Sequence, residues 1–297
     1  DVARSRSKER SARRLGRARV RRRRERPRGP RATAFRWALR LVVVAYLVLL
    51  VAWPVSLVVT KTFEDLGTFG DLFSDPDTVH ALKLTVIVAV VSVVINTVFG
   101  VMISLLLVRH EFRGKRILSP LIDLPMAVSP IVVGLSLVLV YGGRGGWFGP
   151  WLESNGFQVI FAVPGMIMAT TFVALPLVVR ELVPVLEEIG VEQEQAAASL
   201  GAGPFQRFRR ITLPGIKWAL IYGVVLSLAR SLGEFGALKV VSGNILGETR
   251  TATLVVEEKY LNFDQAGAYA TAFLLTMVSV ACIVIVTIIR PKEDRER

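Results

Sequence analysis

The stretch Gln195-Ala-Ala-Ala-Ser-Leu-Gly201, which runs on to Ile211-Thr-Leu-Pro214, lies between two strongly apolar parts of the chain. Alanine has the highest helix propensity and little bulk, so a helix of alanines lets another protein approach closely. Glycine readily adopts positive φ, and Gly201 is therefore predicted to end this helix. An apolar stripe at helical spacing begins at Phe205. We interpret the segment as a docking element: a short helix, a glycine turn and a second helix that ends at Pro214.

Apolar runs of membrane-spanning length surround the docking element. About 20 apolar residues suffice to cross a bilayer as a helix. Such runs without charge are Leu41–Thr60, Leu84–Val108, Leu124–Gly143, Ser154–Val179 and Ala266–Ile289. A sixth run, Trp218–Val241, is interrupted by Arg230, Glu234 and Lys239. In hydrocarbon each segment must satisfy its own backbone hydrogen bonds, which favours helices. The predicted fold class is all-α, a polytopic membrane protein with six transmembrane helices.

Basic residues are concentrated on one predicted side of the membrane. Residues 1–40 carry 17 Lys and Arg against 3 Asp and Glu. Together with 109–116, 180–217 and 290–297, this side holds 30 basic residues, whereas the opposite segments hold 4. Lys and Arg are retained in cytoplasmic loops. Both termini are therefore predicted to be cytoplasmic, which requires an even number of spans.

The charge pattern also suggests a division of the chain. Residues 1–36 are basic and poor in large apolar residues, which predicts a disordered cytoplasmic tail that lies against anionic membrane lipid. Its long charged region is not typical of a secretory signal peptide. Without interleaved aromatic residues the tail is a poor nucleic-acid arm, so no nucleic acid is expected as a partner. Residues 37–290 form the predicted transmembrane domain, with a cytoplasmic loop at about 184–216, and 291–297 form a second tail.

Motifs for catalysis and for nucleotide binding are lacking in the sequence. No Gly-x-x-x-x-Gly-Lys-Ser/Thr loop occurs, so binding of ATP by a P-loop is not expected. His80 and His110 are predicted near opposite membrane faces, too far apart to share a metal. No His-Glu-x-x-His or Gly-x-Ser-x-Gly occurs either. We therefore expect no catalytic residues, no metal site and no cofactor, and an intramembrane enzyme is poorly supported.

The docking element resembles the cytoplasmic "EAA" loop of permease subunits of ABC importers. That loop has Glu-Ala-Ala, a Gly four residues later and a terminal Ile-x-Leu-Pro. Gln195 stands where the loop's Glu is usual, with Glu194 next to it. The resemblance implies that the following residues couple the chain to an ATPase: Glu194, Gln195, Ala196, Ala197, Leu200, Gly201, Phe205, Ile211, Leu213 and Pro214.

Three further segments look like sulfate/thiosulfate ABC permeases of the W type: Asp123–Gly134, Ala229–Gly236 and Val240–Asn244. The resemblance covers residues 37–290 and implies a type I ABC importer permease in a bacterial cell membrane. It also implies three partners: a second homologous permease, two ABC ATPase subunits and an extracytoplasmic sulfate-binding protein. Gly-Glu-Phe-Gly at 233–236 is shared with molybdate permeases, so a molybdate or tungstate permease is an alternative. A secondary anion transporter is the alternative from another class.

Ionisable residues inside a predicted span are costly and normally face protein or water. Arg230 and Glu234 stand four residues apart, so on a helix they share a face and can neutralise each other. This pair either gates an anion pathway or fixes helix packing. Asp123 precedes Leu124-Pro125, where a broken helix would leave polar backbone groups to satisfy. The candidates for the translocation path or gate are Asp123, Ser129, Arg230, Ser231 and Glu234.

The charge asymmetry predicts which loops face the cell exterior. In a Cys282→Ala background, the single substitution Gly70→Cys is expected to react with a membrane-impermeant thiol reagent in intact cells. Gly114→Cys is expected to react only after the membrane is permeabilised. Labelling of Gly114→Cys but not Gly70→Cys in intact cells would invert the topology.

Overall fold

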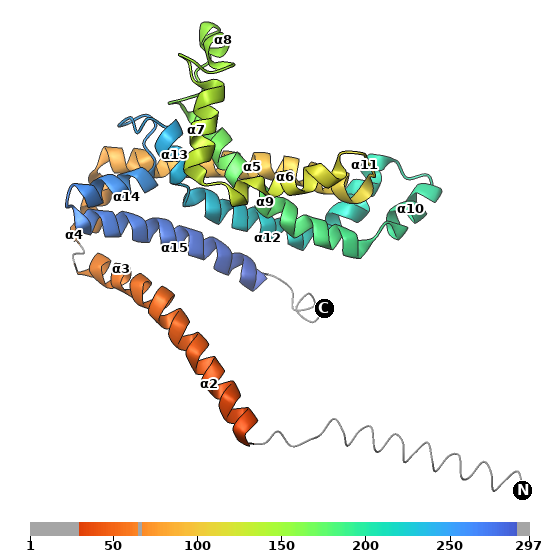
Figure 1. The fold of residues 1–297 in the computed structure, drawn as a ribbon, viewed down its shortest axis with the longest axis horizontal. Coiled ribbons are helices and arrows are strands. Elements are labelled where there is room, and N and C mark those ends of the chain that lie inside the picture. The colour runs from red at the N-terminus through yellow and green to blue at the C-terminus, as the bar shows by residue number, and fades with distance from the viewer. Residues whose placement is uncertain (1–29, 65–66, 290–297) are drawn as a thin grey trace, which may run out of the picture. The chain divides into compact units, whose positions relative to one another are not determined.

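The computed structural model describes residues 30–64 and 67–289, and all regular structure in these ranges is helical. In chain order the helices are α2 (Pro30–Leu47), η1 (Val48–Ala52, a π-helix), α3 (Trp53–Phe63), α4 (Gly67–Ser74), α5 (Pro76–Arg109), α6 (Lys115–Ala127), α7 (Pro130–Tyr141), α8 (Gly149–Ser154), α9 (Val163–Ile189), α10 (Glu192–Ser199), α11 (Pro204–Arg207), η2 (Phe208–Thr212, a π-helix), α12 (Leu213–Leu232), α13 (Gly236–Val241), α14 (Ala252–Leu261) and α15 (Gln265–Ile289) (Figure 1).

Contacts divide the chain into two units, and the boundary along the chain lies between Val58 and Val59. The first unit contains α2, η1 and the start of α3. From Arg36 onward its apolar side chains are largely exposed within the unit. A helix that is apolar on all sides is typical of a membrane span. Most of the predicted basic tail, 1–36, lies outside the described residues, and α2 begins at Pro30.

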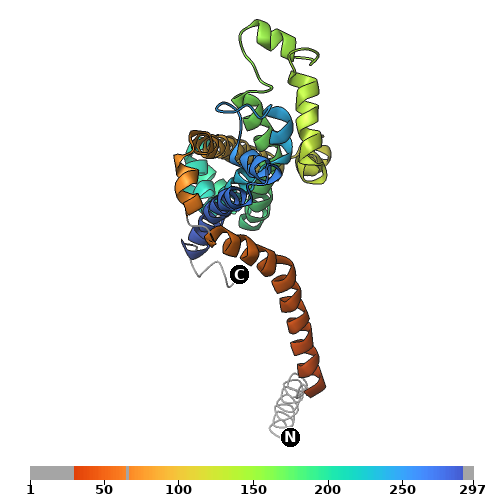
Figure 2. The ribbon, with the colours of Figure 1, turned by 90° about the vertical axis from the view of Figure 1, so that its left-hand side faces the viewer.

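The second unit is built around three long helices. Helix α9 packs against both α5 and α12, and α15 packs against α12. These helices run side by side in Figure 1, and Figure 2 looks along them. Small residues allow close approach, because a Cβ built on Gly100 of α5 would lie only 2.7 Å from Cγ1 of Val178. Such close packing through small residues is typical of helices that associate inside membranes.

Among the residues that the structure describes, five helices are long and apolar enough to cross a membrane: Arg36–Phe63, Pro76–Arg109, Val163–Ile189, Pro204–Leu232 and Gln265–Val284. A sixth span results if α6 and α7, which are bent by 111° at their junction, count as one. The predicted all-α polytopic fold is therefore confirmed, with the third span broken. The prediction of one continuous run over Leu124–Gly143 was wrong, because Pro130 forces the preceding Ser129 into extended backbone.

Two other predicted spans have shifted ends. The fourth, predicted at Ser154–Val179, begins only at Val163 and continues to Ile189. The fifth, predicted at Trp218–Val241, ends at Leu232, where Gly233 begins a short break before α13. Hydropathy does not detect these ends because they depend on backbone geometry and capping.

The sequence predicted that the second helix of the docking element ends at Pro214, but in the structure the helix continues past this residue. Residues Pro204–Leu232 form one continuous helical run. The π-helix η2 ends at Thr212, two residues before the proline, and the Leu213 N–H donates to the Phe208 carbonyl, five residues back. Proline lacks an N–H and clashes with a preceding carbonyl, and a π-helical turn opens the helix locally. The docking element is therefore continuous with the fifth span.

The two ends of the second unit are formed by different helices. Helices α10 and α11 lie at one end, which we call the α10 end, and α4 and α14 lie at the other, the α14 end (Figure 1). The core near the α14 end contains Val88, Met166 and Leu238. Towards the α10 end a second core cluster contains Val178 and Ile216. The docking element thus sits beyond the end of a well-packed bundle.

Candidate functional site

The α10 helix and the turn after it are shaped by two glycines. Gly190 has φ of +70° and ends α9, and Gly201 has φ of +86° and follows α10. Positive φ is the conformation that glycine adopts at helix C-termini. The Ala202 N–H donates to the Ala197 carbonyl across this turn, at 3.0 Å. Glu192 and Glu194 lie in the first turn of α10, where the helix dipole favours acidic side chains.

Two large apolar side chains, one in the turn and one in α11, are largely exposed in the part of the chain that the structure describes. Leu200 is 90% exposed and Phe205 is 74% exposed. Gln195, Ala196, Gly201 and Pro214 are also exposed, whereas Ala197, Ile211 and Leu213 are half-buried. Exposed apolar side chains that stand together, rimmed by polar residues, are typical of a protein interaction site. The α10 end therefore offers a contact surface that residues 30–64 and 67–289 do not cover.

The remaining predicted residue of the docking element, Glu194, points inward. Its Oε1 accepts a hydrogen bond from Arg109 Nη2 at 3.1 Å and another from Thr212 Oγ1 at 2.9 Å. Nη1 of the same arginine donates to the Leu186 carbonyl at 3.0 Å. The carboxylate and the guanidinium are only 19% and 11% exposed. We call these three side chains, Arg109, Glu194 and Thr212, the α10 clamp.

The α10 clamp joins the last residue of α5, the end of α9, and η2 to α10. Removing one partner of a buried ion pair leaves an uncompensated charge, at a typical cost of about 3–5 kcal/mol. Sequence reasoning missed Arg109 and Thr212 as site residues. Arg109 was counted only among the topogenic charges, although a basic residue directly after a long apolar run was a usable signal.

Glu234 lies in the break between α12 and α13 and is 1% exposed. Its Oε2 pairs with Arg230 Nη1 at 2.8 Å, and its Oε1 accepts the Ala237 N–H at 3.0 Å. Its backbone carbonyl accepts a hydrogen bond from the Thr253 hydroxyl at 2.9 Å. Glu234 therefore caps the start of α13 in addition to pairing with Arg230. The buried carboxylate has a structural task that the spacing of the two residues alone did not indicate.

The other predicted path residues are not all brought to one place. Asp123 on α6 pairs with Arg180 on α9, with Nε and Oδ1 2.8 Å apart. Ser129 is exposed in the break before α7. A Cβ built on Gly236 would lie 3.0 Å from Cβ of Pro130, so this break lies beside the start of α13. Ser231 is buried, and its hydroxyl has no hydrogen-bond partner among the described residues.

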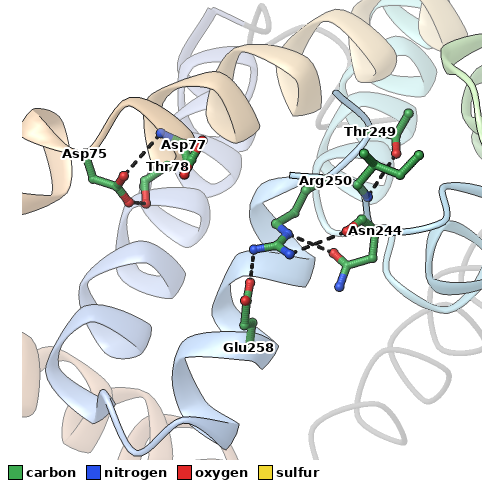
Figure 3. Close-up of polar contacts among 8 residues, drawn as sticks. Asp75, Asp77, Thr78, Asn244, Thr249, Arg250 and Glu258 are labelled. Carbon is green, nitrogen blue, oxygen red and sulfur yellow. Dashed lines mark hydrogen bonds and ion pairs between the residues drawn. The ribbon is translucent and has the colours of Figure 1, made fainter. Parts of the chain in front are cut away.

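A polar network shapes the loop after α13, which contains the Ser-Gly-Asn stretch of the sequence. Asn244 has φ of +53°, and its side-chain carbonyl accepts a hydrogen bond from Arg250 Nε at 3.1 Å (Figure 3). Arg250 also pairs with Glu258 of α14. The Ile245 N–H donates to the Thr249 hydroxyl oxygen at 3.2 Å. The loop is thereby fixed to α14 by side chains that the sequence did not single out.

Figure 3 also shows Asp75, which caps the first turn of α5. Its carboxylate accepts hydrogen bonds from the Thr78 hydroxyl and from the Asp77 N–H. The Thr78 bond is the main cause that lowers the pKa of the Asp75 carboxyl below its ordinary value. The cap contributes stability above that ordinary pKa, and the contribution is lost as the pH falls through the lowered value.

No group of three or more His, Cys, Asp or Glu residues that could hold a metal ion occurs within 30–64 and 67–289. The charged side chains described above instead form ion pairs and helix caps. The arrangement binds helices to one another and presents an apolar surface at the α10 end.

Residues 96–295 match the family of binding-protein-dependent transport system inner membrane components. The chain belongs to this family, the permease subunits of type I ABC importers. The family prediction made from the EAA-like loop is confirmed. The matched residues include the docking element and the three further segments that carried the resemblance.

Named relatives agree with this placement. The permease is 45% identical over 260 residues to the sulfate transport system permease protein CysW of Synechococcus elongatus, covering 87% of this chain and 91% of that protein. It is 47% identical over 207 residues to CysW of Escherichia coli K12, covering 70% and 71%. It is 36% identical over 236 residues to CysT of Salmonella typhimurium, covering 79% and 85%.

A solved structure supports the fold. A crystal structure of a bacterial ABC transporter involved in the import of the acidic polysaccharide alginate contains a chain that matches this permease with a TM-score of 0.73. The match covers 86% of this chain and 95% of that chain at 16% identity. At this identity the likeness concerns the fold alone.

The cap on α13 changes what a charge reversal of the Arg230–Glu234 pair is expected to do. An arginine side chain has no acceptor atom. In the double variant Arg230→Glu, Glu234→Arg, the Ala237 N–H therefore loses its partner even though opposite charges are restored. We expect membrane abundance to stay several-fold below wild type, as measured by quantitative immunoblotting.

The matched control is Glu234→Gln, whose side-chain oxygen can still accept from Ala237. This variant is expected to be more abundant than both the double variant and Glu234→Ala. Wild-type abundance of the charge-reversed double variant would show that the cap on α13 is dispensable.

Proposed function

We propose that this permease is a membrane-spanning subunit of an ATP-driven sulfate importer, with thiosulfate as a second substrate. The observation that carries the substrate is the identity of 45% and 43% to two cyanobacterial sulfate transport permeases, over 87% and 90% of this chain. The rival, a molybdate or tungstate permease, rests on the Gly-Glu-Phe-Gly element alone. Family membership sets aside a secondary anion transporter.

The proposed transporter contains four kinds of subunit. Two ABC ATPase subunits hydrolyse ATP, so this permease is not itself an enzyme. A second, homologous permease completes the translocation path. An extracytoplasmic binding protein delivers sulfate, and a chain of the same fold has been crystallised in a transporter complexed with an alginate pentasaccharide-bound periplasmic protein. In this arrangement both termini and the α10 end face the cytoplasm of a bacterial cell, and the α14 end faces outward.

Coupling to the ATPase is assigned to the docking element, in which the residues from Glu194 to Pro214 have two roles. Leu200 and Phe205 stand free and provide apolar contacts for the ATPase surface. Glu194, through the α10 clamp, connects α10 to α5 and η2. Because Pro204–Leu232 is one continuous helical run, a displacement of the turn moves the fifth span directly. ATP-driven closure of the ATPases thereby switches the spans between inward-open and outward-open states.

The substrate assignment is tested in a bacterial strain that lacks its own sulfate uptake. We expect the complete system, with all four kinds of subunit, to restore ATP-dependent accumulation of radiolabelled sulfate. Unlabelled thiosulfate should compete with the label, and equimolar molybdate should not. Accumulation of radiolabelled molybdate without sulfate would replace the proposed substrate by the rival one.

The coupling assignment predicts a separation of folding from transport at Leu200. Because this side chain is 90% exposed, Leu200→Glu is expected to leave membrane abundance unchanged. A charge in an apolar contact is costly, so we expect sulfate uptake to fall at least tenfold and the ATPase to be lost on purification.

Leu200→Met is the matched control, since it keeps an apolar side chain of similar volume at the same position. It is expected to retain uptake within about twofold of wild type, a range in keeping with a volume-conserving exchange. Wild-type uptake by Leu200→Glu would remove the docking role of this turn.

A further inference from the structure

The ion pair between Asp123 and Arg180 differs in its exposure from the pairs Arg109–Glu194 and Arg230–Glu234. Arg109 and Glu194 are 11% and 19% exposed in their pair. In the second pair Glu234 is 1% exposed and Arg230 is 38% exposed. Asp123 and Arg180 are 44% and 52% exposed. This pair therefore lies on a surface of the second unit and is not enclosed between its helices.

The depth of the pair makes its exposure informative. The charge count placed Arg180 in the cytoplasmic segment 180–217, but in the structure it lies on α9, the candidate span Val163–Ile189, about 13 Å before the end of the helix at 1.5 Å per residue. Asp123 lies on α6, the first half of the broken third span. A charge exposed to hydrocarbon costs about 2.5–3.5 kcal/mol even on the more permissive scales. The surface that carries the pair is therefore expected to face water or protein.

The backbone positions of both residues are firmly held. Each follows a buried residue of one apolar cluster, since Ile122 precedes Asp123 and Val179 precedes Arg180. Ile122 is 8% exposed and Val179 is 4% exposed. The side chains thus project from a fixed scaffold, while their charged ends remain accessible.

The Arg180 guanidinium has further hydrogen-bond donors besides the one that bonds to Asp123. Its hydrogen bond to Asp123 uses Nε and is 2.8 Å long. No hydrogen bond from Nη1 or Nη2 of Arg180 to another part of the described chain is formed. Guanidinium has five N–H donors in a planar fork, which matches the geometry of tetrahedral oxyanions.

We propose that Arg180 is a transient contact for the transported oxyanion, with Asp123 as its exchangeable counter-ion. When the path is empty, Asp123 neutralises Arg180. A passing dianion binds the terminal nitrogens, and the nearby carboxylate repels it, so the anion is released onward. Passage requires binding strong enough for entry and weak enough for exit, and a shared arginine meets both conditions. The proposal rests on the proposed function and names a residue of its pathway.

The test uses the complete transporter in proteoliposomes, with the binding protein and radiolabelled sulfate outside and the ATPases accessible to ATP. Four permease variants are compared: Arg180→Gln, Asp123→Asn, the double variant Arg180→Gln with Asp123→Asn, and Lys115→Gln as control. Lys115 forms an exposed pair with Glu111 at the start of α6. The control therefore removes a positive charge from the same helix as Asp123 but away from the proposed contact.

We expect Arg180→Gln to lower the maximal rate of sulfate uptake at least tenfold. The sulfate concentration for half-maximal uptake, which the binding protein sets, should not change, and neither should ATP hydrolysis stimulated by the loaded binding protein. Asp123→Asn should lower the rate because the anion is released slowly, and internal sulfate should inhibit this variant at lower concentrations than wild type. Lys115→Gln should transport like wild type.

The double variant separates this role from packing. Glutamine and asparagine can hydrogen-bond to each other, so a purely structural pair, including one at the interface with the second permease, would recover uptake. Such recovery would overturn the proposal, as would unchanged uptake in Arg180→Gln. Continued loss of uptake with intact ATP hydrolysis supports it. If the wild-type transporter accumulates molybdate and not sulfate, the substrate assignment fails, and the same comparison with molybdate decides the role of Arg180.

Discussion

One carboxylate, that of Glu194, connects the exposed α10 helix to the bundle, and the geometry of the α10 end depends on it. Its two hydrogen bonds reach α5 and η2, and the arginine that donates one of them also bonds to the end of α9. Along the chain α10 lies between two glycines of positive φ, Gly190 and Gly201. These contacts tie α10 to the ends of α5 and α9 and to η2, and they support the coupling role proposed for it.

A second set of local contacts stabilises the breaks in the apolar helices. Inside a bilayer, backbone groups freed by a broken helix must find partners within the protein. At the start of α13 the Glu234 side chain accepts one such N–H, and the Phe161 N–H donates to the Val241 carbonyl at 2.8 Å near the end of α13. The break before α7 packs against Gly236 in the same region. The two interrupted spans therefore support each other.

These contacts divide the charged residues of the spans into two groups. Arg109 and Glu194 are largely buried and Glu234 is fully buried, although its partner Arg230 is 38% exposed. Arg109, Glu194 and Glu234 also bond to backbone or to a neighbouring hydroxyl, so these two pairs hold elements together. Asp123 and Arg180 are exposed at both partners, and the structure gives them no capping task. The sequence left open whether Arg230 and Glu234 gate a path or fix helix packing, and it also named Asp123 as a path candidate. The structure pairs Asp123 of α6 with Arg180 of α9 at an exposed position.

The sequence by itself determined the helical class, the approximate spans, the docking element and the family, because run length, hydropathy and short motifs are local properties of a chain. It misplaced the ends of the fourth and fifth spans and the role of Pro214, since caps and a π-helical turn depend on backbone geometry. Only the tertiary structure decided the partners of Glu194 and Asp123, which lie 85 and 57 residues away along the chain. The physical reason is that such pairs depend on how each helix is rotated against its neighbours, and packing at Gly100 and Gly223 sets that rotation.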